Sequence, residues 1–306
     1  MTQLLSLRFA PTVLSADLQE LVNIEPRTKR HTLAAGLTLV ADHWGNEDDD
    51  PVLFLHGGGQ TRHSWGGTAR ALAETGRYAI TVDLRGHGES GWNSDGRYQL
   101  SVFADDTHQL ISSLGLRPAL VGASVGGMTG MLLEGTQHPG TISSLILVDI
   151  VPRMNAEGAD RVKAFMMEHA RSGFASLEEV ADAIGAYNPH RPRPKDLEGL
   201  KRNLRERDGR WYWHWDPAFI EQSLEGGPRE VRDPDFMASV MASVTVPTLL
   251  VRGKMSDLVT EEGAKGFLAE HPQAEYVDVS GAGHMVAGDK NDVFTAAVVE
   301  FLDRDR

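Results

Sequence analysis

The amino-acid sequence predicts an α/β fold in which a mostly parallel sheet is covered by helices on both faces. Short apolar runs rich in Val, Ile and Leu recur along the chain, and their length and composition suit strands that are buried on both faces. Segments of helical length with a partly amphipathic pattern lie between most of these runs. This alternation is typical of parallel sheets whose strands are connected by helices.

The expected elements follow in order along the chain. The strand-like runs are VLFLHGG (52–58), YAITVDL (78–84), ALVGAS (119–124), LILVDI (145–150), TLLVRG (248–253) and EYVDVS (275–280). Helices are expected at 64–75, 102–114, 128–138 and 261–270. An earlier stretch, LTLVADHWG (37–45), alternates as an antiparallel edge strand does.

One interval breaks this alternation, because LILVDI and TLLVRG are separated by residues 151–247. The interval is rich in charge and proline and contains helix-like stretches at 160–171 and 177–186. We therefore expect a mainly helical cap at 152–244, inserted into a core formed by 31–151 and 245–306. Residues 1–30 are expected to form an N-terminal arm.

Composition narrows the classes of function. The chain has 306 residues, of which 41% are hydrophobic, so it is expected to be globular and ordered. Its formal charge of −13 would repel a phosphate backbone, and no nucleic-acid partner is expected. No apolar run approaches the ~20 residues that a membrane span requires. The chain has no cysteine, so a catalytic nucleophile is expected to be an oxygen atom. The absence of cysteine also fits a reducing cytoplasm, where we expect the protein. A homo-oligomer is possible, and a small-molecule substrate is the expected partner.

A candidate nucleophile lies in the stretch VGASVGGM (121–128), which contains the pattern Gly-x-Ser-x-Gly. Ser124 directly follows an expected strand and precedes an expected helix, which is the context that this motif requires. Gly122 and Gly126 would let strand and helix approach closely. The serine hydroxyl is then expected to project from the carboxyl edge of the sheet, near the positive end of the following helix.

A serine nucleophile needs a base and an acid that orients the base. His284, in the loop SGAGHM after the last expected strand, can reach the same edge of the sheet. Asp257 follows TLLVRG by a short loop and is our predicted acid. Asp149, at the end of LILVDI, is the alternative, although a carboxylate there could instead cap the start of the inserted unit.

The expected oxyanion hole comes from HGGG (56–59), a loop free of bulky side chains after an expected strand. The amide of Gly58 would act together with the amide of Val125, the residue after the nucleophile. The loop lacks both common phosphate-binding glycine patterns, so a nucleotide site is not expected.

Five ordered motifs together resemble the α/β-hydrolase superfamily, in its capped subgroup of haloperoxidase-like esterases, epoxide hydrolases, lactonases and C–C bond hydrolases. The motifs are HGGGQTRHSW, DLRGHGES, VGASVGGM, RGKMSD and GAGHM. The resemblance spans roughly residues 30–304 and implies an eight-stranded sheet with the cap after strand 6. It also implies that Asp83, Arg85 and His87 form a structural turn and that no metal or organic cofactor is required.

The resemblance implies a serine hydrolase that cleaves a carboxylic ester or lactone of a fairly hydrophobic small molecule. Ser124 argues against epoxide hydrolases and haloalkane dehalogenases, which carry aspartate at that position. A C–C bond hydrolase acting on a diketone or dienoate is the first alternative, and a ligand-binding member without turnover is the second. Met285 after the catalytic histidine, where C–C hydrolases often carry tryptophan, weakens the first alternative.

Residues expected near the substrate are Gly59, Trp213 and Met285. Trp213 belongs to WYWHW (211–215), whose alternation places its tryptophans on one face of an extended segment. Such tryptophans anchor a cap more often than they contact a substrate, and both roles remain open for Trp213.

Overall fold

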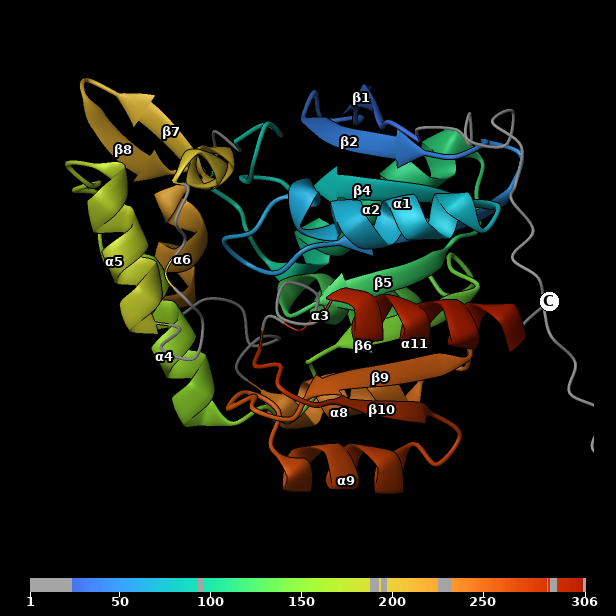
Figure 1. The fold of residues 1–306 in the computed structure, drawn as a ribbon. Helices are drawn as coiled ribbons and strands as arrows, with labels where there is room; N and C mark the ends of the chain where they lie inside the picture. Colours follow the sequence, from blue (N-terminus) through green and yellow to red (C-terminus); the bar gives the residue numbers. More distant parts are fainter. Residues whose placement is uncertain are drawn as a thin grey trace, which may run out of the picture.

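The computed structural model describes residues 24–92, 96–187, 193, 197–224, 233–284, 286 and 291–304. Its main sheet has eight strands in the order β1-β2-β4-β3-β5-β6-β9-β10 (Figure 1). The strands are β1 (Arg27–Thr32), β2 (Thr38–Trp44), β3 (Asp50–Leu55), β4 (Arg77–Asp83), β5 (Ala119–Ala123), β6 (Ser144–Val148), β9 (Thr248–Gly253) and β10 (Glu275–Val279). β1 and β2 pair antiparallel with their neighbours, and the other pairs are parallel. The predicted sheet is confirmed.

Helices cover both faces of the sheet because its strands are apolar on both sides. Along β3, Val52 and Phe54 belong to one hydrophobic cluster, while Leu53 and Leu55 belong to the other. The first cluster includes residues of α1 (Gly66–Glu74) and α11 (Asn291–Arg304), which lie in front of the sheet in Figure 1. The second includes residues of α2 (Leu100–Leu114), α3 (Val125–Leu132), α8 (Pro234–Ala242) and α9 (Glu261–Glu270).

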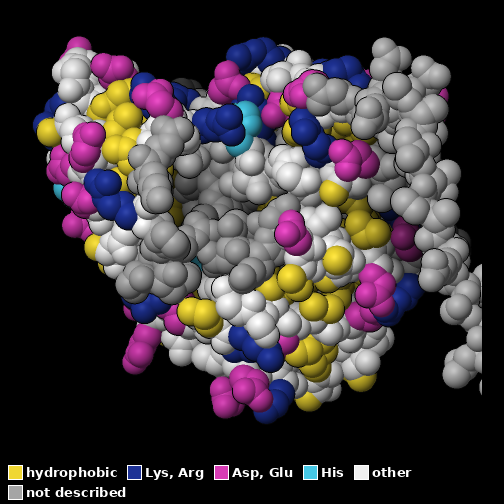
Figure 2. Space-filling model, in the orientation of Figure 1, with side chains coloured by type: hydrophobic (Ala, Val, Ile, Leu, Met, Phe, Trp, Pro, Cys, Tyr) yellow, Lys and Arg dark blue, Asp and Glu magenta, His cyan; other side chains and the backbone are white. Residues whose placement is uncertain are grey.

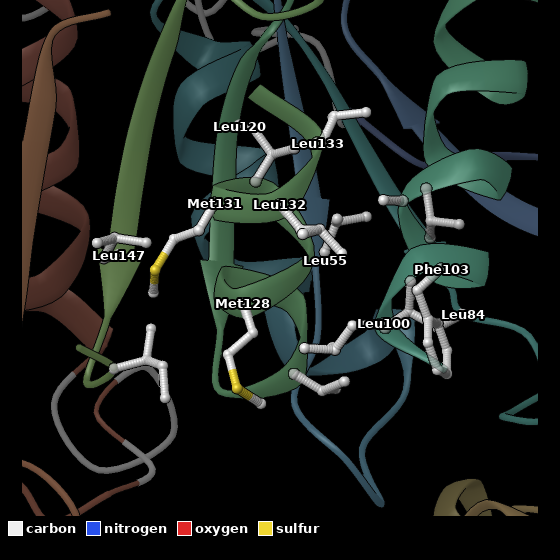
Figure 3. Packing of buried hydrophobic residues seen from close by; sticks show 14 of the residues in the cluster. Leu55, Leu84, Leu100, Phe103, Leu120, Met128, Met131, Leu132, Leu133 and Leu147 are labelled. Carbon is white, nitrogen blue, oxygen red and sulfur yellow. The ribbon is translucent and has the colours of Figure 1, made fainter. Parts of the chain in front are cut away.

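The helix α3 is the most deeply buried of these elements, because every residue from Val125 to Leu132 is buried. Its sequence VGGMTGML is apolar on all sides, as a helix enclosed by protein must be. Figure 3 shows Met131 and Leu132 lying among leucines of the neighbouring strands. A π-helical turn, Leu133–Gln137, follows directly. Close packing on every side fixes the start of α3, where the candidate nucleophile lies.

The inserted unit follows β6 as predicted and includes more than helices. Its elements are α4 (Ala156–Met167), α5 (Leu177–Tyr187), the 3-10 helix η4 (Glu198–Asn203), the hairpin β7 (Leu204–Arg207) and β8 (Arg210–Trp213), and α6 (Pro217–Leu224). These elements stand to one side of the sheet in Figure 1. The helix α8 instead packs on the core. Its residue Val240 lies so close to Gly135, in the π-helical turn after α3, that a Cβ on Gly135 would be 2.4 Å from the carbonyl oxygen of Val240. We therefore propose a narrower cap than 152–244.

The start of the fold also differs from the expected boundary at residue 31. β1 begins at Arg27 and is the edge strand, so the stretch LTLVADHWG forms β2, one position further into the sheet. The sequence of β1, RTKRHT, has no apolar residue from which to detect a buried face. Charged residues on an edge strand discourage pairing with other chains.

Among the described residues, no helix is both long and apolar enough to cross a membrane. On the face shown in Figure 2, acidic and basic side chains are interspersed over the core and the inserted unit.

Candidate active site

Ser124 occupies a sharp turn between β5 and α3. Its backbone has φ 47° and ψ −116°, a conformation that a residue with a side chain adopts only when its surroundings impose it. A Cβ on Gly122 would lie 2.5 Å from the carbonyl carbon of Gly126, and one on Gly126 would lie 2.3 Å from the carbonyl oxygen of Leu55. Side chains at either glycine would force strand and helix apart. The two glycines therefore allow the turn that presents the half-buried Ser124.

The structure brings His284 to Asp149. The Nδ1 atom of His284 lies 2.8 Å from Oδ2 of Asp149, whose side chain is fully buried, whereas 17% of the imidazole is exposed. Register pairs Ala123 with Val148, so Ser124 and Asp149 directly follow paired residues of neighbouring strands. Both have positive φ, and for Asp149 it is 51°. Nδ1–H donates to the carboxylate, which leaves Nε2 of His284 available to accept a proton.

Neutral donors hold the carboxylate of Asp149 in place. The backbone N–H of Gly253 donates to Oδ1 at 3.0 Å, and the hydroxyl of Ser256 donates to Oδ2 at 2.5 Å. The same hydroxyl accepts the backbone N–H groups of Leu258 and Val259, at 3.1 and 3.2 Å. Sequence reasoning missed Gly253 and Ser256. The signal that could have found them is their position at or just after the end of β9, the strand that pairs with β6 and so ends next to Asp149.

The loop that carries His284 is fixed by backbone contacts with the loop after β9. The N–H of Met255 donates to the carbonyl oxygen of Ala282 at 2.9 Å, and the N–H of Lys254 donates to that of Val279 at 3.0 Å. A Cβ on Gly253 would lie 2.2 Å from the carbonyl oxygen of Gly283. The two loops thus approach so closely that a side chain at Gly253 would displace the segment leading into His284.

Asp257, the acid predicted from the sequence, is not brought to His284. Its carboxylate forms an ion pair with Arg161 of α4, and 36% of the Asp257 side chain is exposed. Its carbonyl oxygen faces Gly158, where a Cβ would approach to 2.4 Å. The chain has turned from the sheet edge toward the inserted unit by this point. We therefore propose Asp149, the alternative, as the acid in place of Asp257.

Asp149 does not cap the inserted unit either. The side chain of Asn155 caps α4 by accepting the N–H of Gly158 at 2.9 Å. The carboxylate of Asp149 is therefore available for its contact with His284.

The glycine loop after β3 lies beside Ser124. A Cβ on Gly57 would be 3.4 Å from Cβ of Ser124. The N–H of Gly57 donates to the side-chain oxygen of Gln60 at 3.0 Å, and the N–H of Gln60 donates to the carbonyl oxygen of Gly57 at 3.1 Å. The neighbouring N–H of Gly58 and that of Val125, at the N-terminus of α3, are the amides that the sequence predicted for an oxyanion hole.

Apolar side chains of the inserted unit cover this loop. A Cβ on Gly58 would lie 3.2 Å from Phe219, and one on Gly59 would lie 3.2 Å from both Met166 and Trp215. Met166, Trp215 and Phe219 come from α4, the segment after β8 and α6. Gly59, expected near the substrate, is therefore packed directly against the inserted unit. An apolar roof over the loop favours apolar ligands.

Trp213 and Met285 complete the predicted set. Trp213 stacks on Trp215 with ring centroids 4.8 Å apart, and it also packs against Phe165 and Phe174 inside the inserted unit. Trp215 contacts the glycine loop, so the anchoring contact expected of this aromatic segment is made by Trp215. Met285 lies outside the described residues.

Comparison with known proteins shows the family to which this fold belongs. The family model for the alpha/beta hydrolase fold matches residues 50–290. An esterase from Mycobacterium tuberculosis is 30% identical over 260 residues, which cover 82% of each chain. A non-heme chloroperoxidase from Kitasatospora aureofaciens is 29% identical, over 89% of this chain and 98% of its own. A solved structure of E-2-(acetamidomethylene)succinate hydrolase has a TM-score of 0.80 at 23% identity, covering 91% of this chain and all of that one, which shows a shared fold.

Proposed function

The chain belongs to the α/β-hydrolase family, and we propose that it is a serine hydrolase that cleaves a carboxylic ester or lactone of a fairly hydrophobic small molecule. The observation that carries this proposal is the contact between His284 and the buried Asp149, one strand away from the strained turn at Ser124. A base held by a carboxylate beside a serine at such a turn is the arrangement that activates a serine hydroxyl.

In the proposed reaction, the Oγ of Ser124 attacks the carbonyl carbon while Nε2 of His284 takes the hydroxyl proton. Asp149 stabilises the resulting imidazolium through the bond to Nδ1. The amides of Gly58 and Val125 stabilise the negative oxygen of the tetrahedral intermediate. Collapse of that intermediate breaks the bond to the alkoxy oxygen, which receives the proton from His284. The acyl group remains on Ser124.

Deacylation repeats these steps with water as the nucleophile. Nε2 of His284 removes a proton from water as it attacks the acyl carbonyl, and then returns the proton to Oγ of Ser124. The products are a carboxylic acid and an alcohol, or a single hydroxy acid if the substrate is a lactone.

The proposed preference for hydrophobic substrates rests on the apolar side chains of the inserted unit that cover the glycine loop. Met166, Trp215 and Phe219 lie against Gly58 and Gly59, so the acyl or alkoxy group next to the reacting carbonyl would meet apolar surface. Burial of such a group contributes roughly 25 cal/mol per Å² of apolar area. The similarity to an esterase also favours esters, and cytoplasmic location remains our expectation.

The proposal is tested by Ser124→Ala, assayed on p-nitrophenyl esters of increasing chain length and on a panel of lactones. We expect kcat to fall by about 10⁴-fold or more, because no other group can form the acyl-enzyme, while the thermal midpoint changes little. A fluorophosphonate probe should label the wild type at Ser124 and leave the variant unlabelled. Equal turnover by the folded variant would refute the mechanism.

A further inference from the structure

Three imidazoles are buried together behind the glycine loop, although they come from distant parts of the sequence. His56 follows β3, His87 lies in the turn after β4, and His214 belongs to the inserted unit. His56 and His87 are fully buried, and 2% of His214 is exposed. The ring centroids of His56 and His87 are 5.1 Å apart, and those of His87 and His214 are 5.9 Å apart.

The hydrogen bonds of His214 fix its tautomer. Its Nδ1 lies 2.7 Å from the backbone N of Gly88, which can only donate, so Nδ1 accepts. Its Nε2 therefore carries the hydrogen when the ring is neutral, and it donates to the carbonyl oxygen of Gly59 at 3.2 Å. Burial lowers the pKa of His214 well below its usual value, which agrees with a neutral ring.

His56 makes the complementary contact. Its Nε2 accepts the N–H of Leu84 at 3.0 Å, and its Nδ1–H donates to the carbonyl oxygen of Gly57 at 2.8 Å. That carbonyl and the N–H of Gly58 belong to one planar peptide group, so holding the oxygen also fixes the direction of the N–H. The carbonyl oxygens of Gly57 and Gly59, the residues before and after Gly58, thus each accept a hydrogen bond from an imidazole.

We propose that His214 is a positioning residue through which the inserted unit holds the oxyanion loop in its active conformation. This role rests on the proposed function of the Gly58 amide. Gly59 has φ +75°, a conformation open to glycine with little strain. Its carbonyl belongs to the same peptide group as the N–H of Gln60, which the loop holds from one side through the bond to the carbonyl oxygen of Gly57 at 3.1 Å. The bond from His214 to the carbonyl oxygen of Gly59 adds a restraint from outside the loop, and oxyanion stabilisation depends on the position of its donors.

Other contacts seat the inserted unit here without using His214. The N–H of Asp216 donates to the carbonyl oxygen of Gly86 at 2.8 Å, and the hydroxyl of Tyr98 donates to Oδ2 of Asp216 at 2.7 Å. Phe219 packs on Gly58 and edge-on to His87. Loss of the bond between His214 and Gly59 should therefore loosen the Gly59 end of the loop while the inserted unit stays in place.

A matched pair of variants separates positioning from packing. In His214→Asn, the side-chain oxygen can replace Nδ1 as the acceptor for Gly88, but the shorter side chain does not reach Gly59. In His214→Gln, the longer side chain can donate its amide N–H to Gly59. With p-nitrophenyl butyrate, we expect His214→Asn to lower kcat by about 10- to 100-fold with KM changed less than about threefold, and His214→Gln to stay within about threefold of wild type in both.

A second readout does not depend on turnover. Hydrogen exchange of the backbone amides in residues 56–60 should be faster in His214→Asn than in wild type, and near wild type in His214→Gln. Equal exchange in both variants, or a loss of kcat that follows the melting temperature in both, would overturn the positioning role. If exchange behaves as expected but Ser124→Ala keeps its activity, the loop-holding role stands and the proposed hydrolase mechanism fails.

Discussion

Two buried aspartates at the carboxyl edge of the sheet, Asp83 and Asp149, show how differently one side chain can be used. Asp83 ends β4, and its carboxylate meets the guanidinium of Arg62 at 2.5 Å. It also accepts the backbone N–H groups of Arg62 and Glu89, at 2.7 and 2.9 Å. Asp149 follows β6 and meets the imidazole of His284, with neutral donors from Gly253 and Ser256.

The difference lies in what the partner can do with a proton. A guanidinium remains charged at any pH that proteins encounter, so the pair of Asp83 and Arg62 can only hold the turn that follows β4. An imidazole nitrogen can accept a proton and release it again, so the pair of Asp149 and His284 can take part in proton transfer. Burial and a carboxylate at a strand end therefore do not distinguish a structural aspartate from a reactive one.

The largest expected effect that separates the two aspartates is on activity. Asp149→Asn should lower kcat/KM by about 10³- to 10⁴-fold, because an amide neither stabilises the imidazolium nor holds the required tautomer. Ester hydrolysis measures the loss, and circular dichroism checks that the variant is folded. Retention of more than a tenth of wild-type activity would exclude Asp149 as the acid.

Asp83→Asn should reverse the pattern by affecting stability more than chemistry. Weakening the buried pair with Arg62 should lower the free energy of unfolding by about 2 kcal/mol, because a charge-assisted hydrogen bond is lost while the guanidinium keeps its ion pairs with Asp42 and Glu89. Urea denaturation measures this loss. The folded variant should keep kcat within about tenfold of wild type, and a loss as large as that of Asp149→Asn would remove the distinction between the two aspartates.

Low pH should also destabilise the fold through His56 and His87, two buried histidines on the same side of the sheet edge as Asp83. Burial lowers the pKa of His56 to about 4 and that of His87 to about 3, from the usual 6.5. Between pH 6.5 and 4 the unfolded chain therefore binds protons that the folded chain does not, and stability falls as the pH is lowered. Their contribution is fully present above pH 6.5.

Urea denaturation at pH 7, 6, 5 and 4.5 measures this dependence. His87→Phe, which removes one of these groups, should reduce the slope of unfolding free energy against pH by up to one proton. A free energy of unfolding that is constant between pH 7 and 5 would contradict neutral buried histidines.

Asp257→Asn is the control with the smallest expected effect. It breaks an ion pair with Arg161 in which both side chains are substantially exposed, and such pairs contribute at most about 1 kcal/mol. Activity should stay within about threefold of wild type. If this variant loses activity while Asp149→Asn does not, the carboxylate originally predicted from the sequence is the acid after all.

Much of the fold was predictable because its signals are local. The six apolar runs correspond to strands β3, β4, β5, β6, β9 and β10, and the expected helix at 261–270 corresponds to α9. The expected helix at 128–138 begins earlier, at Val125, and ends in a π-helical turn. β1 was missed because it lacks apolar residues, and the hairpin of β7 and β8 was not distinguished within a segment expected to be mainly helical.

The sequence by itself determined the position of Ser124, because Gly122, Ser124 and Gly126 lie within five residues and their conformations depend on one strand and one helix. For the acid, sequence reasoning preferred Asp257, although Asp149 also follows a strand and also precedes His284. Only the tertiary structure shows that Asp149 contacts His284 while Asp257 pairs with Arg161, through the pairing of β6 with β5 and the turn of the chain after β9. It also brought His214 to Gly59, 155 positions away. Contacts between distant segments depend on how the strands and the inserted unit pack, which no local pattern encodes.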